Sequence, residues 1–240
     1  MARLFVSDVH LDVSAPAATE QFLQFLSGEA SGAEALYILG DLFEAWVGDD
    51  DADPDKERVC QGLHALTRRG VPCFLLHGNR DFLLGARFCE RSGCRLLPDP
   101  VVAQFAGEDV LLTHGDALCT DDHSYQELRS VVRQSAWQRR FLALPRERRE
   151  LLADEARAGS RRHTSSTVPV IMDVNPESVA AAFRATGVRR MIHGHTHRPA
   201  VHELTVDGTA AQRIVLGAWY EQGSYVRQES GGYRLYQLPR

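Results

Sequence analysis

The sequence contains few cysteines, and none of them is spaced as a pair. No two of the five form a Cys-x-x-Cys motif. An odd number without such pairs favours a reduced intracellular protein over a disulfide-stabilised secreted one. We therefore expect buried thiols at Cys60, Cys73, Cys89, Cys94 and Cys119.

Long apolar runs are also absent. The first such run, Leu4 to Val6, is interrupted by Asp8 and is far shorter than the core of a signal peptide. No window approaches the roughly 18 continuous apolar residues that span a bilayer. We therefore expect a protein made and kept in the cytosol, with any membrane contact confined to its surface.

There is no excess of positive charge. The 27 basic and 32 acidic residues give a net charge of -5, which argues against a generally basic nucleic-acid-binding protein. Lys56 is the only lysine, so nearly all basic side chains are arginines. The composition, 44% hydrophobic and 25% charged over 240 residues, is typical of one globular domain, here residues 1–240. The ten histidines are the unusual feature.

Short apolar runs alternate with helical patterns in the first third of the chain. We expect buried strands at 3–7, 35–39 and 73–76, with helices at 17–26 and 56–69 between them. Strands that alternate with helices in this way predict an α/β fold with a parallel sheet.

The remainder of the chain predicts further strands on either side of a helical segment. A hairpin at 101–105 and 110–113 comes first, followed by helices without strands from 122 to about 167. Beyond this segment we expect a helix at 176–185, a strand at 189–192 and antiparallel strands at 200–206, 212–216, 224–228 and 233–238.

Short polar motifs follow the predicted strands. Because the carboxyl ends of strands share one edge of an α/β sheet, motifs that are distant in sequence should converge there. An Asp-x-His or His-x-His pair in an extended chain points both side chains to one face, where they can hold one metal ion. The motifs are Asp8-Val9-His10, Gly40-Asp41, Gly78-Asn79-Arg80-Asp81, His114-Gly115-Asp116 and Gly194-His195-Thr196-His197.

These motifs supply oxygen and imidazole donors without a thiolate, a set that suits Mn(II), Fe(II) or Zn(II) better than Ca(II). If Asp41 bridges, each of two ions has four protein ligands, and such a pair can activate a water for phosphate-ester hydrolysis. A single Asp-x-His is common by chance, but the ordered set favours a metal site. The candidate ligands are Asp8, His10, Asp41, Asn79, His114, His195 and His197, whereas His64, His77, His193 and His202 are unassigned.

Together the motifs resemble those of the calcineurin-like metallophosphoesterases, whose pattern runs D-x-H, G-D, G-N-H-[DE], a histidine after a strand, and G-H-x-H. The resemblance implies a four-layer αββα sandwich of two mixed sheets with the metals at one edge. It also implies that one ion is held by Asp8, His10, Asp41 and His197, and the other by Asp41, Asn79, His114 and His195.

Arg80 departs from that pattern, because most of the superfamily has a histidine there. An arginine cannot act as a general acid at ordinary pH, but its planar guanidinium can hold a phosphate. This residue favours a substrate whose leaving group needs no proton, such as a phosphate leaving from a pyrophosphate.

A narrower resemblance covers nearly the whole chain. The strings at 40–46, 78–82, 114–122, 171–175 and 193–199 are similar to those of the UDP-2,3-diacylglucosamine diphosphatase family of lipid A biosynthesis. The resemblance implies attack of metal-activated water on the α-phosphorus of UDP-2,3-diacylglucosamine, giving UMP and 2,3-diacylglucosamine 1-phosphate (lipid X). It also implies two Mn(II) per chain and a peripheral location on the cytoplasmic side of the bacterial inner membrane. We expect a monomer without a nucleic-acid partner.

The helical segment at 122–167 is interpreted as a substrate-binding insertion, or lid, within the single domain. Ten arginines and four acidic residues between 129 and 163 give it a local charge of +6. Trp137 and Phe141 lie among these cations, as a substrate with two acyl chains and a pyrophosphate requires. The charge would also attract an anionic bilayer. The alternative is a solvated helical pair that packs its apolar face on the core.

The family resemblance also implies roles for individual residues. Thr164 and Thr167 stand where the family commonly has asparagine and lysine, so a charge is lost at Thr167, for which Arg161 or Arg162 is a candidate replacement. The implied catalytic residues are Asp41, Asn79, Arg80 and His195, and the implied substrate contacts are Asn79, Arg80, Asp122, Arg157, Ser160, Thr164, Thr167 and His195.

Two other functions remain open. Another dimetal phosphodiesterase, nucleotide pyrophosphatase or phosphatase would carry the same motifs and would turn over nucleotide-only substrates. A calcineurin-like scaffold without catalysis would typically have lost ligands, and all seven are present.

Overall fold

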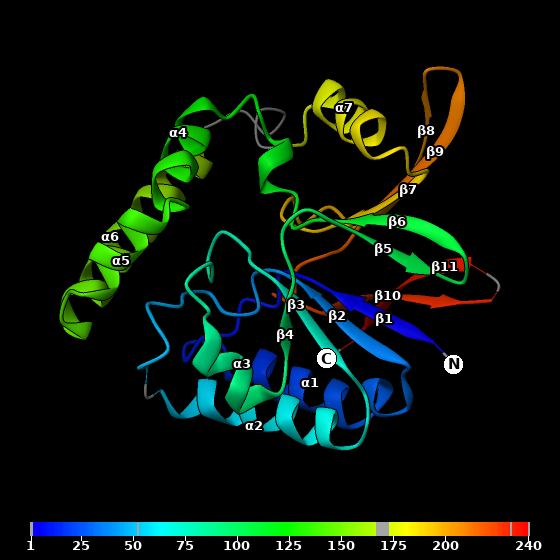
Figure 1. Ribbon diagram of the computed structural model, residues 1–240. Helices are drawn as coiled ribbons and strands as arrows, with labels where there is room; N and C mark the ends of the chain where they lie inside the picture. The colour runs from blue at the N-terminus through cyan, green and yellow to red at the C-terminus, as the bar shows by residue number, and fades with distance from the viewer. Residues whose placement is uncertain (1, 52, 167–172, 231, 240) are drawn as a thin grey trace.

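The structure is a computed structural model that describes residues 2–51, 53–166, 173–230 and 232–239, with 161–166 described by their backbone only. Two mixed sheets lie face to face between layers of helices (Figure 1). The strand order of the first sheet is β11 (Gly232–Leu238), β10 (Gly223–Glu229), β1 (Arg3–Val6), β2 (Ala35–Leu39), β3 (Cys73–Leu76) and β4 (Arg95–Leu96). The order of the second is β5 (Val101–Phe105), β6 (Glu108–Leu112), β7 (Arg190–His193), β9 (Thr209–Val215) and β8 (Ala200–Val206).

The pairing within the sheets explains why they are mixed. Strands β1 to β4 run parallel, as the alternation of strands and helices predicts, and β10 adds antiparallel to β1. In the second sheet β6, β7 and β9 are parallel, while β5 and β8 pair antiparallel with β6 and β9. The four C-terminal strands do form two antiparallel hairpins, but the hairpins belong to different sheets, and the chain crosses between them at residues 216–222.

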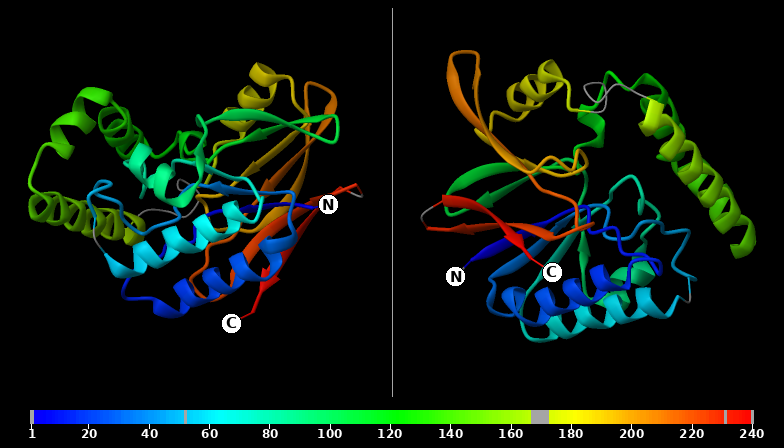
Figure 2. Two further views of the ribbon diagram at one scale, coloured as in Figure 1. Left: turned by 60° about the horizontal axis from the view of Figure 1, so that its bottom comes forward. Right: turned by 180° about the vertical axis from the view of Figure 1, so that it is seen from behind.

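Three helices cover the outer face of the first sheet, and one covers the second (Figures 1 and 2). The first group is α1 (Pro16–Ser27), α2 (Pro54–Arg68) and α3 (Ala86–Ser92), while α7 (Pro176–Thr186) lies on the second sheet. One apolar cluster, including Phe22 and Leu63, joins the first group to its sheet, and another joins Phe183 of α7 to Met191. A third cluster, including Phe5 and Ile192, fills the space between the sheets. The αββα sandwich is therefore confirmed.

Helix boundaries follow local capping. The carboxylate of Asp53 accepts from the backbone N–H groups of Asp55 and Lys56, so α2 begins at Pro54, two residues before the expected start. Helix α3 was not expected, because its seven residues are too few to show a helical period; Gly93, at φ 74°, ends it.

The segment predicted to be helical without strands forms three helices, α4 (His123–Val132), α5 (Ser135–Leu142) and α6 (Arg146–Ser166), which we call the lid. They project to one side of the sandwich (Figures 1 and 2). Within the described part of the chain, none of the helices has both the length and the apolar character to traverse a bilayer.

Buried ion pairs attach the lid to the sandwich at its first helix. Asp116, fully buried after β6, accepts from the Tyr125 hydroxyl at 2.6 Å and from Arg129 Nε at 2.8 Å. Arg133 donates to the carbonyl oxygen of Gly78 at 2.9 Å. Because Gly78 precedes a candidate ligand and Asp116 follows one, α4 is held directly against the candidate site.

A second attachment lies at the start of α6. Arg149 is only 2% exposed, and its guanidinium donates to the Val47 carbonyl and to both carboxylate oxygens of Asp50. Its Nε donates to the Leu144 carbonyl at 3.0 Å. A guanidinium buried in this way has to keep all these partners, because an unpaired buried charge is strongly destabilising. The lid is therefore held to the sandwich at α4 and at the start of α6.

Candidate metal centre

The candidate ligands meet where β1, β2, β3, β6 and β7 end. Two groups of their donor atoms lie close enough to hold an ion: Asp8, His10 and His197 form one, and Asp8, Asp41 and His114 form the other. All these side chains except His197 are buried. Five motifs spread over nearly 190 residues of the sequence thus converge, as their positions after strands predict.

The first group is built around one oxygen of Asp8. Asp8 Oδ1 lies 3.3 Å from His197 Nε2 and 3.8 Å from His10 Nε2, and these two ring nitrogens are 3.1 Å apart. Although Asp8 Oδ1 is buried, it has no hydrogen-bond partner. Buried carboxylate oxygens without a partner are costly, and a cation at this point would satisfy Asp8 Oδ1.

Asn79 adds an amide oxygen beside the second group. Its Oδ1 lies 2.9 Å from His114 Nε2 and 2.8 Å from His195 Nδ1. Asp41, a member of the second group, also faces the first, with Oδ2 at 3.7 Å from His114 Nε2 and 3.8 Å from His10 Nε2. This position is the one that a bridging carboxylate would need.

The backbone at the ligands differs from the expected geometry. Asp8, His10, Asp41, His195 and His197 all have positive φ angles, between 52° and 66°. The side chains of the Asp-x-His and His-x-His pairs do converge, but not through the alternation of an extended strand. These residues lie on tight loops beyond the strand ends, with backbones in the left-handed region. That conformation is strained for a residue with a side chain and is typical of functional sites.

Two glycines allow the loops to approach each other. A Cβ on Gly78 would lie 2.0 Å from Asp41 Oδ1, and one on Gly40 would lie 2.6 Å from the Cα of Gly78. No side chain fits at either position, because both contacts are far below van der Waals distance. Gly40 also has φ 88°, which disfavours other residues.

The hydrogen bonds of two histidines direct a lone pair toward each group. His114 Nδ1 lies 2.9 Å from the Leu39 carbonyl and His10 Nδ1 lies 2.8 Å from Glu44 Oε2, so each Nδ1 carries the proton that it donates. In the neutral rings Nε2 is then an acceptor that faces other acceptors. Metal-binding histidines commonly donate their other ring N–H to a carboxylate or a backbone carbonyl in this way, and the donor set fits a divalent metal.

The electrostatics of the site also favour a cation. Burial would lower the pKa of His114, but the negative charges of Asp41, Asp8 and Asp116 outweigh it and raise that pKa to about 9. Burial, with Asp81 and Asp8, raises the pKa of Asp41. In contrast, burial and the charge of His114 lower the pKa of His195 to about 3, which leaves its ring neutral as a metal ligand has to be.

Sequence reasoning missed two supporting carboxylates. Asp81, fully buried, accepts from the backbone N–H groups of Leu42 at 2.7 Å and Gly78 at 2.9 Å, so it holds the second and third motifs together. Glu44 orients His10. Asp81 does stand within a quoted motif and could have been found there, but nothing local to Glu44 indicates a partner 34 residues away.

Arg80 lies between the centre and the lid. Its backbone N–H donates to Asp41 Oδ1 at 2.8 Å, its Nη2 lies 3.5 Å from Ser160 Oγ on α6, and its Nη1 lies 3.9 Å from Glu44 Oε1. The structure thus brings together Arg80 and Ser160, two of the residues assigned to substrate.

The other implied substrate contacts have varied surroundings. Asp122 caps α4, accepting from the backbone N–H of Tyr125 at 3.1 Å, and Arg157 pairs with Asp154 on α6. Thr167 and the side chain of Thr164 lie outside the described residues.

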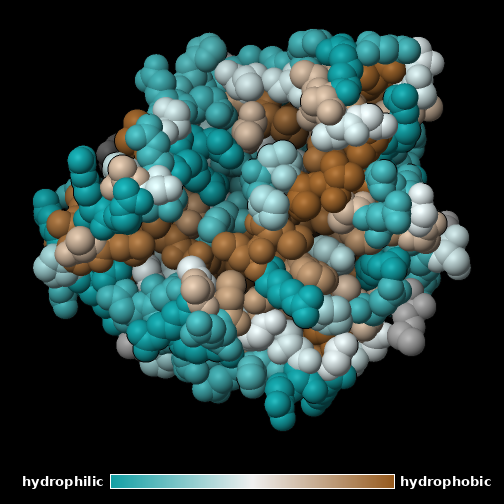
Figure 3. Space-filling view, in the orientation of Figure 1, coloured by the Kyte–Doolittle hydropathy of each residue, from teal (hydrophilic) through white to brown (hydrophobic). Residues whose placement is uncertain are grey.

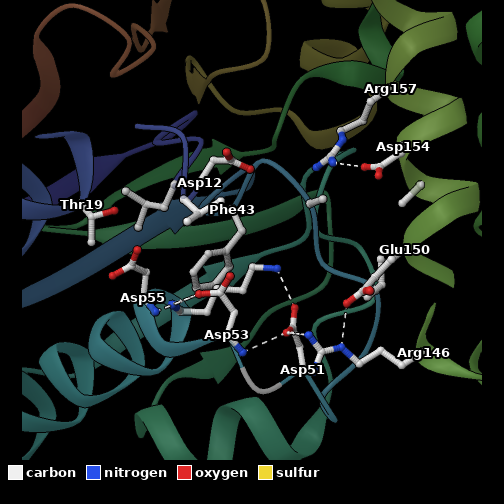
Figure 4. A pocket seen from close by; sticks show the side chains of 16 residues that line it. Asp12, Thr19, Phe43, Asp51, Asp53, Asp55, Arg146, Glu150, Asp154 and Arg157 are labelled. Atoms are coloured by element: carbon white, nitrogen blue, oxygen red, sulfur yellow. Dashed lines mark hydrogen bonds and ion pairs between the residues drawn. The ribbon is translucent and has the colours of Figure 1, made fainter. Parts of the chain in front are cut away.

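Arg157 borders a cavity of about 130 Å³ between α6 and the sandwich (Figure 4). Apolar side chains such as Phe43, Val47 and Ala153 line it together with charged groups. Lys56 and Arg146 both pair with Asp51 at its edge, and Figure 4 shows Arg146 facing Asp51. The lid therefore covers the sandwich without closing the space beneath it.

The aromatic residues of the lid form a short stack. Trp137 stacks on Phe141 with ring centroids 4.9 Å apart and lies 6.2 Å from Phe82 of the sandwich. Phe141 is buried within the main apolar cluster, whereas Leu142 and Leu144 are exposed. Figure 3 shows a band of apolar surface that crosses this face from the region of α5 and α6 toward the middle. Part of the apolar face thus packs on the core, as the alternative interpretation requires, and part remains exposed.

Comparisons with known proteins agree with this geometry. The profile of the calcineurin-like phosphoesterase family matches residues 1–199. The chain is 51% identical over 239 residues to a UDP-2,3-diacylglucosamine hydrolase of Enterobacter sp. (strain 638), and 50% identical over 239 residues to one of Escherichia coli (strain K12); both alignments cover 100% of each chain. Among solved structures, an archaeal phosphodiesterase has a TM-score of 0.50 at 14% identity, covering 99% of this chain and 100% of its own, a likeness of fold alone.

Proposed function

Because the chain belongs to the calcineurin-like phosphoesterase family, we propose that it hydrolyses the pyrophosphate bond of UDP-2,3-diacylglucosamine to UMP and 2,3-diacylglucosamine 1-phosphate. The observation that carries the proposal is the combination of the donor set with the attached lid. Both occur in a chain that is about half identical, over its full length, to hydrolases named for this substrate. Water attacks at the α-phosphorus.

The donor set is proposed to bind two Mn(II) ions. Asp8, His10, Asp41 and His197 would hold one ion, while Asp41, Asn79, His114 and His195 would hold the other. When bound, such ions supply Lewis acidity toward phosphate oxygens and lower the pKa of a bound water.

Arg80 is proposed to hold the pyrophosphate. The backbone N–H of Arg80 donates a hydrogen bond to Asp41 Oδ1, and its Nη2 contacts Ser160 Oγ. These two contacts place the guanidinium at the mouth of the centre. A guanidinium placed there stabilises charge that develops on the phosphoryl oxygens. No protein acid is needed, because a phosphate monoester leaves without protonation. Asn79 and His195, whose Oδ1 and Nδ1 atoms lie 2.8 Å apart, are proposed to help orient the same oxygens.

The lid is proposed to bind the acylated sugar within the single domain. Ser160 and Arg157 of α6, Asp122 of α4, and Thr164 and Thr167 are the residues assigned to the sugar and its phosphate. The stacked rings of Trp137 and Phe141 provide an apolar wall for acyl chains.

Replacing both Trp137 and Phe141 with serine is expected to lower kcat/KM for UDP-2,3-diacylglucosamine by about tenfold or more, since burial of a large apolar side chain is worth about 1.5–3 kcal/mol. Hydrolysis of a short phosphodiester without acyl chains should change by less than about threefold. The measurement is kcat/KM of the wild type and the variant with both substrates, together with a thermal melt of each protein. Equal losses with both would indicate that the rings only stabilise the fold.

The outer face of the lid is proposed to contact an anionic bilayer on the cytoplasmic side of the inner membrane. Exposed Leu128, Leu142 and Leu151 accompany exposed arginines, including Arg139 and Arg140. Each such arginine contributes about 1 kcal/mol near an anionic surface. Co-sedimentation with phosphatidylglycerol vesicles should therefore fall as salt rises and should be weak with phosphatidylcholine. Salt-independent binding, or none, would contradict the assignment.

The test of the function is release of UMP from UDP-2,3-diacylglucosamine by the Mn(II)-loaded protein, compared with a dinucleoside polyphosphate. We expect the acylated sugar nucleotide to be turned over at least about a hundredfold more efficiently, because only it reaches both the centre and the lid. Equal turnover of both would favour a general nucleotide pyrophosphatase.

A further inference from the structure

Tyr220 is an exposed aromatic residue at the mouth of the metal centre. The residue is 54% exposed, and its ring stacks on the imidazole of His10 with centroids 5.1 Å apart and planes 19° apart. It also meets the ring of His197 edge-on at 5.4 Å. One face of the tyrosine thus rests on a candidate ligand, while more than half of the residue remains in contact with solvent.

The loop that carries this ring is firmly anchored. The preceding residue, Trp219, is fully buried, and its backbone N–H donates to the Asp8 carbonyl at 3.0 Å. Its indole Nε1 donates to the Ser224 carbonyl at 3.0 Å, and its ring meets those of Phe22 and Phe25 edge-on. A large exposed aromatic held in place beside a reaction centre is a preformed stacking surface, because little side-chain freedom remains to be lost on binding.

The two ends of the centre are occupied differently. Tyr125 of the lid lies beside His195, with ring centroids 5.8 Å apart, while Tyr220 lies beside His10 and His197 at the other end. Tyr125 already serves a structural contact, since its hydroxyl donates to the buried Asp116. Tyr220 comes from the crossing between the two sheets and presents its ring to the opening.

From these observations we propose that Tyr220 is the stacking surface for the pyrimidine base of the substrate and of the UMP product. This inference rests on the proposed function. The acylated sugar extends along the lid, and the nucleoside, on the other side of the α-phosphorus, extends past His10 to Tyr220. Aromatic stacking on a base commonly changes affinity by about tenfold or more and needs no hydrogen-bond readout.

The test is calorimetric titration of the Mn(II)-loaded full-length protein with UMP and with ribose 5-phosphate, which lacks the base. The wild-type protein should bind UMP more tightly. Tyr220→Ala should weaken UMP binding by about tenfold and leave ribose 5-phosphate unchanged, whereas Tyr220→Phe and Tyr220→Trp should retain UMP binding. Tyr236→Ala is the matched control, because Tyr236 also stacks on an aromatic ring, that of Tyr225 on β10, in the outer strands of the first sheet.

Two results would overturn the assignment. Equal weakening of both ligands by Tyr220→Ala would mean that the ring only supports His10, and equal affinity of the wild type for both ligands would mean that no base is stacked. Failure of the proposed function is a separate result, because it would appear as no UMP release from UDP-2,3-diacylglucosamine by the wild type. Normal release with a UMP affinity insensitive to Tyr220→Ala would remove only the role of Tyr220.

Discussion

Replacing Asp41 with alanine is expected to lower kcat for UDP-2,3-diacylglucosamine by about a hundredfold or more, because both ions lose a ligand at once. Asp41 Oδ2 lies 3.8 Å from His10 Nε2 and 3.7 Å from His114 Nε2, so it faces ring nitrogens from both donor groups. Its other oxygen accepts from the Arg80 backbone, so the variant also loosens the residue assigned to the pyrophosphate.

The measurement combines steady-state kinetics with metal analysis of the same preparation. Bound Mn(II) should fall from about two ions per chain to about one or fewer. Asp109→Ala is a suitable control, since this exposed aspartate accepts from Gln104 Nε2 at 3.2 Å and lies near the start of β6, whereas His114 follows the end of that strand. A loss smaller than about tenfold, with metal content unchanged, would exclude a bridging role for Asp41.

The convergence of the candidate metal ligands could be predicted from the sequence because each follows a strand whose position is predictable. Asp8, Asp41 and His114 come directly after apolar runs, and strand ends share an edge whatever the details of the loops. The local geometry could not be predicted. The positive φ angles of Asp8 and His10 depend on a parallel bridge between Leu11 and Phe43 and on the tight approach of the neighbouring loops, which are tertiary features.

The roles of the supporting residues could not be predicted from the sequence, for a related reason. Asp116 stood in a quoted motif, yet its role is to accept from Tyr125 and Arg129 of the lid, and that contact exists only once α4 folds back over the centre. Tyr220 carries no motif. Its position depends on Trp219 joining the core and hydrogen bonding to Asp8, more than two hundred residues earlier in the chain. Spacing rules describe neighbours along an element, whereas these pairs meet only through packing.

The hairpins at the C-terminus show the same limit in the fold. Alternating patterns and the turn at Asp207-Gly208 were sufficient to predict that β8 and β9 pair antiparallel. They carried no information on which sheet each hairpin joins. The parallel pairing of β9 with β7 places Ile214 beside Ile192, and β10 places Val226 opposite Phe5, so burial between the two sheets decides the assignment.

Removing the metal should abolish activity and lower the thermal stability of the protein together. After exhaustive chelation we expect less than about 1% of the initial rate, because the proposed mechanism activates water through the metal ions. The midpoint of thermal unfolding should fall as well, since ligands that bind only the folded state stabilise it. Without a cation, Asp8 and Asp41 remain buried close together, and Asp8 Oδ1 keeps no partner.

Restoring the metal provides the control for this experiment. Mn(II) should recover both the rate and the melting temperature, whereas Ca(II) should recover neither, because four imidazoles and an amide suit a transition metal better than a hard cation that prefers oxygen ligands. The stability readout is independent of turnover, so it separates a lost cofactor from a lost substrate site. Full activity in the chelated protein would contradict the dimetal centre, and recovery with Ca(II) would contradict the role assigned to His10, His114, His195 and His197.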